Sequence, residues 1–176
     1  MNRKMPIIFQ GGYRIKRRST LSFMKKEGSE LLALNDLVVK SGSDGRLARF
    51  SVLADSELVA EYSCDGIVFA TPTGSTAYSL AAGGPIVHPD SDVMLMTPIS
   101  AHTLTSRSVV FPSGISLSIH SEGNSDDPLV TADGQPAFEG SVRLPLEVSV
   151  SKQTFPLLEE IKHSHFRVLR NKLKWG

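Results

Sequence analysis

The 176-residue chain has one cysteine, Cys64, and a net charge of only +1. A single cysteine cannot form an internal disulfide, and such scarcity is typical of a reducing compartment. No apolar run approaches the length of about 18 residues that a transmembrane helix needs. The apolar stretch near the basic N-terminus is also too short for a signal peptide. We therefore expect a soluble, cytoplasmic protein in which Cys64 is a buried structural thiol.

The small net charge removes any global electrostatic argument for a nucleic-acid or membrane partner, and we expect neither. Basic residues nevertheless gather in residues 14–26 and 166–176. Solvated faces of a helix or strand are the simpler interpretation, and a phosphate-rich ligand near both ends is the alternative. With 40% hydrophobic and 21% charged residues, the composition is that of an ordinary globular chain with a core.

Alternation of apolar and polar residues is the main structural signal. It predicts half-buried antiparallel strands over residues 46–54, 115–120 and 141–150. More continuous apolar runs predict buried strands over residues 34–40, 65–71 and 92–99. In the first three segments the residues expected to share an apolar face are Ala48, Phe50 and Val52; Ile115, Leu117 and Ile119; and Val142, Leu144, Leu146, Val148 and Val150.

Helix is scarce, and turn signals separate the predicted strands. Residues 75–84 can form one short helix, with Ser75 as its N-cap and Gly83 as its stop. Residues 163–175 predict a second, amphipathic helix. The turn signals lie at 41–45, 83–85, 112–114, 122–128 and 133–136. The predicted class is mainly β, a two-sheet sandwich with one short helix and a C-terminal arm.

The stretch "DGIVFATPTGSTAYSLAAGGP", residues 65–85, is rich in hydroxyls and glycines and almost free of charge. Its order is strand, turn, short helix, and the backbone N–H groups at a helix start favour anions and acceptors. It is not a P-loop, because no lysine follows the glycines, and it does not match the dinucleotide glycine fingerprint. From these residues alone, a nucleotide site and a tight structural turn are equally supported.

Asn35 and Asp36 interrupt an apolar run, where two buried polar groups are costly unless they find partners. An aspartate can accept from the paired hydroxyls of a ribose, while an asparagine amide can bind a donor–acceptor edge. The alternative is a bulge or turn with both side chains facing solvent. At another strand end, Asp133, Gly134 and Gln135 favour a simple hairpin turn.

Taken in order, several segments resemble the C-terminal domain of NAD kinases. They are "ALND" (33–36), "DGIVFATPTGSTAYSLAAGGPIV" (65–87), "TPISAHTLTSRSVVFP" (97–112), "DGQ" (133–135) and "LRNKLKWG" (169–176). The opening "FQGGYRIKRRSTL" (9–21) resembles the segment by which the family leaves its N-terminal domain. The resemblance covers nearly the whole chain from Phe9.

This resemblance implies phosphorylation of NAD at its adenosine 2′-hydroxyl, with ATP or polyphosphate as donor and a divalent metal such as Mg²⁺. It also implies assembly as a dimer or tetramer. The implied division is a connector from a missing N-terminal α/β domain (1–24), the NAD-binding sandwich (25–160) and an amphipathic tail (161–176). The residues that the family's motifs place on NAD are Asn35, Asp36, Arg46, Asp65, Thr73, Thr76, Ala77, Tyr78, Ser79, Leu80, Ala81 and Gln135.

One departure from the family is large. The Gly-Gly-Asp-Gly loop that carries the family's proposed general base belongs to the N-terminal domain, and this chain has no such loop. The "GSDG" at 42–45 comes in the wrong order and predicts a hairpin turn. We therefore expect no catalytic residue here and little turnover by this chain alone. The alternatives are a non-catalytic nucleotide-binding or regulatory module and a relative of the lipid kinases.

Overall fold

The computed structural model describes residues 10–24, 30–42, 48–103, 105–122, 128–138, 142 and 144–175. These residues divide into two compact units. The larger one is Arg18–Phe155, and the smaller one joins the described residues up to Arg17 with those from Pro156 on. In the ranges just given, no helix is long and apolar enough to cross a membrane.

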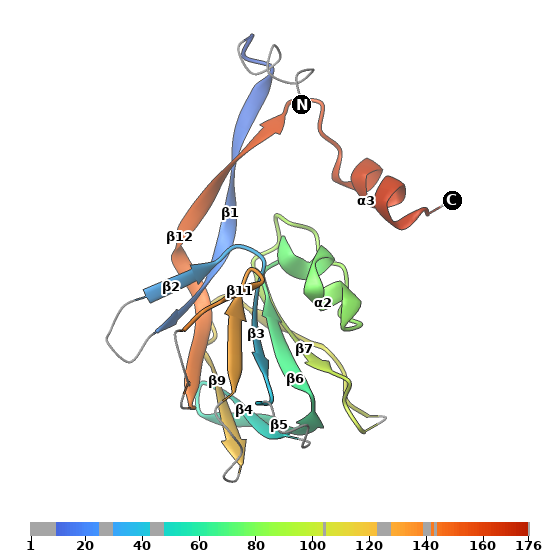
Figure 1. The fold of residues 1–176 in the computed structure, drawn as a ribbon. Helices are drawn as coiled ribbons and strands as arrows, with labels where there is room; N and C mark the ends of the chain where they lie inside the picture. Colours follow the sequence, from blue (N-terminus) through green and yellow to red (C-terminus); the bar gives the residue numbers. More distant parts are fainter. Residues whose placement is uncertain are drawn as a thin grey trace. The chain divides into compact units, whose positions relative to one another are not determined.

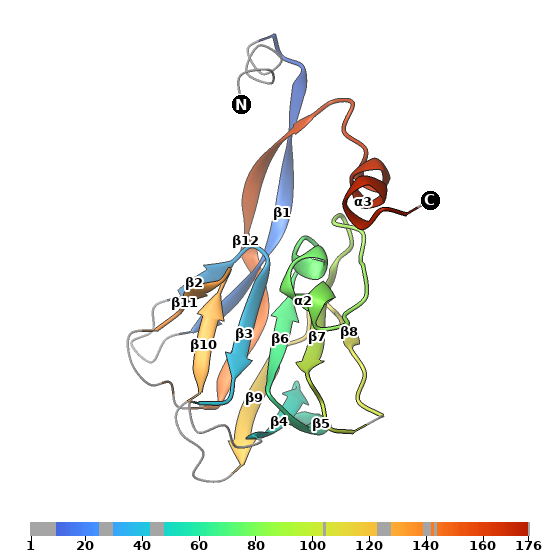
Figure 2. The same ribbon diagram turned by 45° about the vertical axis from the view of Figure 1, so that its right-hand side comes forward.

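Two six-stranded sheets form the framework (Figures 1 and 2). The order in the first sheet is β2 (Glu30–Ala33), β1 (Tyr13–Met24), β12 (Leu146–Glu160), β9 (Leu117–Glu122), β4 (Ala48–Ala54) and β5 (Glu57–Cys64). The order in the second is β11 (Gln135–Pro136), β10 (Leu129–Ala132), β3 (Asp36–Lys40), β6 (Gly66–Ala70), β7 (Val93–Ile99) and β8 (Val109–Pro112). Figure 2 shows β10, β3, β6, β7 and β8 side by side.

The core lies between the two sheets, which confirms the predicted β-sandwich. Phe50 and Val52 of β4 and Leu117 of β9 pack in one buried cluster with Phe69 of β6 and Met96 of β7. The side chains that alternation placed on one face of β4 and β9 are therefore the buried ones. Burial of such a face fixes strand register, since a slip of one residue would expose every side chain on it.

The outer face of the second sheet is covered by the segment that follows β6. Val68 and Leu95 on that face pack against Ala82 and Val87. The covering segment contains the 3₁₀ helix η1 (Gly74–Thr76) and the one-turn helix α2 (Tyr78–Ala81), seen beside β6 in Figure 1. Gly83 follows with φ +88, so the predicted stop of this short helix is confirmed.

The predicted N-cap of this helix is wrong. Ser75 lies inside η1, and α2 begins at Tyr78 with Ala77 as its N-cap and no side-chain cap. The Ser75 hydroxyl is buried, donates to the Pro72 carbonyl at 2.7 Å and accepts from the Val87 N–H at 3.1 Å. The hydroxyl is used to join two parts of the loop, so none is left to cap the helix.

Two other segments differ from the pattern-based expectation. The strand predicted over 141–150 begins only at Leu146, after the cis bond between Leu144 and Pro145. Residues 14–24, whose form the sequence left open, lie in the long strand β1.

The smaller unit contains the outer ends of β1 and β12 and the helix α3 (His165–Leu173). An ion pair of 2.6 Å joins Arg14 to Glu159 within it. The predicted second helix is confirmed, with Ser164 as its N-cap accepting from the Arg167 N–H at 3.3 Å.

Candidate functional site

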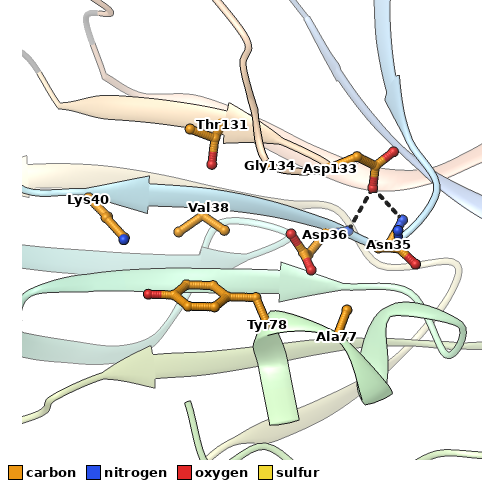
Figure 3. Close-up of a pocket in the computed structure, with 9 residues that line it drawn as sticks. All are labelled: Asn35, Asp36, Val38, Lys40, Ala77, Tyr78, Thr131, Asp133 and Gly134. Atoms are coloured by element: carbon orange, nitrogen blue, oxygen red, sulfur yellow. Dashed lines mark hydrogen bonds between the residues drawn. The ribbon is translucent and has the colours of Figure 1, made fainter. Parts of the chain in front are cut away.

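A cavity of about 450 Å³ lies in the larger unit, on the outer side of β3 (Figure 3). Three segments supply its walls: the start and one face of β3, the end of the hydroxyl-rich loop, and the turn between β10 and β11. The lining residues are Asn35, Asp36, Val38, Lys40, Ala77, Tyr78, Thr131, Asp133 and Gly134.

The face of strand β3 that lines this cavity changes from acidic to apolar to basic along the strand. Asp36, Val38 and Lys40 alternate along the strand, so their side chains leave it on the same side. Lys40 lies four residue steps along the strand from Asp36, which puts their Cα atoms about 13 Å apart. Figure 3 shows the Asp36 carboxyl and the Lys40 amine on either side of Val38. The cavity therefore has an acidic end and a basic end with an apolar side chain between them.

The acidic end is fixed by a carboxylate from another strand pair. Asp133 (φ +48) and Gly134 (φ +76) form the two-residue turn between β10 and β11, and positive φ at both positions is the signature of a type I′ hairpin. The Asp133 carboxylate accepts from the backbone N–H groups of Leu34 (2.8 Å), Asn35 (2.6 Å) and Asp36 (3.3 Å). The predicted turn is confirmed, and the Asp133 side chain within it fixes the backbone at the start of β3.

The hydroxyl-rich loop is seated against the same backbone. Thr71 donates its N–H to the Asn35 carbonyl at 2.9 Å and its hydroxyl to the Leu34 carbonyl at 2.6 Å. Its Oγ1 also accepts from the Gly74 N–H at 3.0 Å. Ser79 lies 3.3 Å from the Thr97 hydroxyl, and both side chains are buried. These hydroxyls hold the loop in place, and the residues that it turns toward the cavity are Ala77 and Tyr78.

Asp36 is the electrostatically unusual residue of the cavity. It is only 4% exposed, and this burial raises the pKa of its carboxyl above the ordinary value of 3.8. A hydrogen bond from the Tyr78 backbone N–H lowers that pKa, and the nearby Asp133 raises it. A buried carboxyl of raised pKa in a cavity is a recognised mark of a functional site.

Tyr78 forms the wall facing β3. Tyr78 is 38% exposed, and the Lys40 Nζ lies 5.0 Å from the ring centroid, within range of a cation–π contact. The ring gives the middle of the cavity a flat apolar surface.

Comparison with known proteins shows the family. Residues 34–160 match the sequence model described as ATP-NAD kinase C-terminal domain. The chain belongs to this family. Among curated relatives, the NAD kinase of Bdellovibrio bacteriovorus is 40% identical over 151 residues, which are 86% of this chain and 50% of the relative. The NAD kinase of Syntrophobacter fumaroxidans is 36% identical over 173 residues, covering 96% of this chain and 61% of the relative. The chain thus spans about half to three-fifths of their lengths.

Two solved structures of kinases of NAD or NADH have a fold similar to that of this chain. The crystal structure of yeast NADH kinase complexed with NADH superposes with a TM-score of 0.86 at 26% identity, covering 98% of this chain and 53% of that one. An NAD kinase from Archaeoglobus fulgidus in complex with ATP gives a TM-score of 0.79 at 24% identity, covering 97% and 64%, and shows the shared fold alone. The family and fold expected from the sequence are confirmed.

Of the residues that the resemblance to NAD kinases implies, four gather at the cavity of this NAD kinase C-terminal domain: Asn35, Asp36, Ala77 and Tyr78. The others in the helical loop, namely Thr73, Thr76, Ser79, Leu80 and Ala81, adjoin these residues in the chain but do not line it. Gln135 is exposed at the start of β11. Arg46 and most of "GSDG" lie outside the described residues.

Asp65 stands apart from the acidic end. It directly precedes Gly66, which pairs with Lys40, whereas Asp36 pairs with Ala70 at the other end of β6. Sequence reasoning missed Lys40, Thr131 and Asp133. For Lys40 a signal existed, because it lies four residues after Asp36 on a strand and must share its face.

Proposed function

We propose that this NAD kinase C-terminal domain binds the adenosine part of NAD in the cavity beside β3. It would hold the adenosine 2′-hydroxyl for phosphoryl transfer from ATP or polyphosphate, which yields NADP. The observation that carries the proposal is the buried Asp36 carboxyl beside Tyr78 in the wall of a cavity of about 450 Å³. That volume falls in the range of roughly 300–1,000 Å³ usual for small-molecule sites.

The chemistry of the walls suits a nucleoside. An ionised carboxylate can accept about four hydrogen bonds, and the Tyr78 N–H uses only one of these positions on Asp36. Ribose hydroxyls can donate to the remaining ones. The Tyr78 ring and Val38 offer apolar contact to a base or sugar, and apolar walls with few polar groups are typical of such sites.

The proposal gives this chain binding and orientation, and leaves the general base to a segment carrying Gly-Gly-Asp-Gly, which this sequence does not contain. Within the ranges that the structure describes, no group of three or more His, Cys, Asp or Glu side chains is placed to hold a metal ion. The proposal therefore names no Mg²⁺ ligand among these described residues. Residues 1–24 would connect to the N-terminal domain and residues 161–176 would return to it.

Isothermal titration with NAD tests the binding. We expect the unaltered protein to bind, and Asp36→Ala or Tyr78→Ala to weaken binding. Each hydrogen bond to a charged group is worth about 1.5–3 kcal/mol, so Asp36→Ala should cost about tenfold to a hundredfold in Kd. Asp92→Ala, at an exposed aspartate away from the cavity, is the matched control. A titration indifferent to both cavity variants would refute the proposed site.

A coupled assay with NAD, ATP and magnesium tests whether this chain only binds NAD and depends on another segment for the general base. We expect little or no NADP from this chain alone, and turnover once a protein segment carrying the Gly-Gly-Asp-Gly loop is supplied. Robust NADP formation by the 176-residue chain would contradict the assignment of the general base to another segment.

A second candidate is a non-catalytic nucleotide-binding module, which would use the same cavity. It predicts the same titration but no turnover under any complementation. A lipid-kinase relative would instead bind diacylglycerol or sphingosine and ignore NAD. We also propose that the protein works in the cytoplasm and that it assembles as a dimer or tetramer. Light scattering of the purified protein would test the oligomeric state.

A further inference from the structure

Lys40 is the cavity residue that the function described above does not yet use. It is the single cation among the described residues that line the cavity, and its side chain is exposed. The contact between its Nζ and the Tyr78 ring directs the ammonium along the cavity wall. The two carboxylates of the lining stand at the other end of β3, where Asp133 is engaged by three backbone N–H groups.

We propose that the Lys40 ammonium pairs with a phosphate group of the bound nucleotide and makes the site prefer nucleotides to nucleosides. The proposal rests on adenosine binding in the same cavity, with its sugar hydroxyls toward Asp36. In a nucleotide the 2′- and 3′-hydroxyls and the 5′-phosphate leave opposite edges of the ribose. A cavity lined by carboxylates at one end of β3 and by an ammonium at the other matches that polarity.

The position of Lys40 also favours this role on physical grounds. An ammonium is a compact charge with three hydrogen-bond donors, which suits a phosphate. Because the Lys40 side chain is exposed, its ammonium stays partly hydrated until a ligand binds. The ammonium itself lies over the Tyr78 ring in the structure. Such a contact at an exposed site is weak, so a phosphate can draw the ammonium toward it.

The test is a set of titrations with three probes, adenosine, AMP and NAD, at low and at 150 mM salt. The variants are Lys40→Met, which keeps a long unbranched side chain without the charge, and Lys40→Arg, which keeps the charge. Lys152→Met is the matched control, at an exposed lysine of β12 that does not line the cavity. Thermal melting of each variant verifies that it is folded.

We expect the unaltered protein to bind AMP and NAD about fivefold more tightly than adenosine, the upper limit for an exposed ion pair, with the difference shrinking as salt rises. Lys40→Met should abolish this preference, by lowering the affinity for AMP and NAD to that for adenosine. Lys40→Arg and Lys152→Met should keep it.

Two results would overturn the inference while leaving adenosine binding intact. One is a preference for AMP that survives Lys40→Met, and the other is an equal loss for adenosine and AMP in that variant. Failure of all three probes to bind the unaltered protein would instead refute the proposed function and this inference with it.

Discussion

Gly74 is the point at which the hydroxyl-rich loop touches the start of β3. A Cβ atom added there would lie 1.9 Å from the Asn35 carbonyl oxygen and 2.4 Å from its carbonyl carbon. Real Cβ atoms essentially never approach closer than 3.0 Å, so Gly74→Ala would force the two segments apart by about 1.1 Å. Both partners are backbone, and no side chain can turn aside to make room.

The cost follows from the contacts that this separation stretches. Thr71 bonds to the Asn35 carbonyl at 2.9 Å and to the Leu34 carbonyl at 2.6 Å, and both bonds join the same two segments. Two hydrogen bonds at about 1 kcal/mol each, or overpacking at about 1–3 kcal/mol, place the destabilisation near 1–3 kcal/mol. For a chain of this size the melting temperature should fall by about 2–12 °C. Since Tyr78 follows on the same loop, affinity for NAD should fall as well.

Thermal melting and NAD titration of Gly74→Ala measure both effects. Gly114→Ala is the control, because a Cβ at Gly114 would have no atom within 4 Å and its φ lies outside the left-handed region. We expect the control to melt like the unaltered protein. Gly74→Ala with the melting temperature and affinity of this control would refute the tight seating of the loop on Asn35.

Three further predictions concern single side chains. Burial raises the pKa of Asp36 above 3.8, so the folded protein binds that proton more tightly than the unfolded chain and becomes relatively less stable as pH rises through the folded pKa. Asp36→Asn should therefore melt higher than the unaltered protein at pH 7, with the gain shrinking toward pH 3.8; a gain equal at every pH would contradict this. Asp133→Ala removes the acceptor of three N–H groups and should cost about 1–2 kcal/mol in urea unfolding, and Asp133→Asn, which keeps an acceptor oxygen, should cost less. Cys64 is fully buried, and burial raises its pKa to about 11, so it should react with a disulfide reagent at pH 8 only after unfolding; rapid labelling of the native protein would disprove that burial.

The sandwich could be predicted where burial imposes alternation on the sequence. Phe50 and Val52 show it plainly, because only one face of β4 is buried. Strand β1 hides the pattern because two of its buried residues are polar. Arg18 pairs with Asp90 at 2.6 Å, and the Thr20 hydroxyl donates to the Gln153 carbonyl at 2.7 Å. Their partners lie 72 and 133 positions away in the sequence, where no local pattern can indicate them.

The site was predictable to a similar, limited degree. Asn35 and Asp36 were singled out because they interrupt an apolar run and match a family motif, and Tyr78 because of that resemblance alone; all three line the cavity. Asp133 could be predicted only as a turn, since its importance comes from N–H groups that lie nearly a hundred positions earlier. The hydroxyls of Thr71 and Ser75 suggested a ligand, yet the structure uses them to fasten the loop.

These contacts separate two kinds of residue around the cavity. Gly74, Thr71 and Asp133 join backbone segments, so changes there should lower stability and affinity together. Asp36 differs, because its carboxyl is held in a buried position that disfavours its charge, next to the like charge of Asp133. Folding alone gives no reason to keep such a group, whereas a ligand that donates hydrogen bonds to it does. Asp36→Asn should therefore raise stability at neutral pH while it lowers affinity for NAD, and these opposite signs are what separates a recognition residue from a scaffold residue at this site.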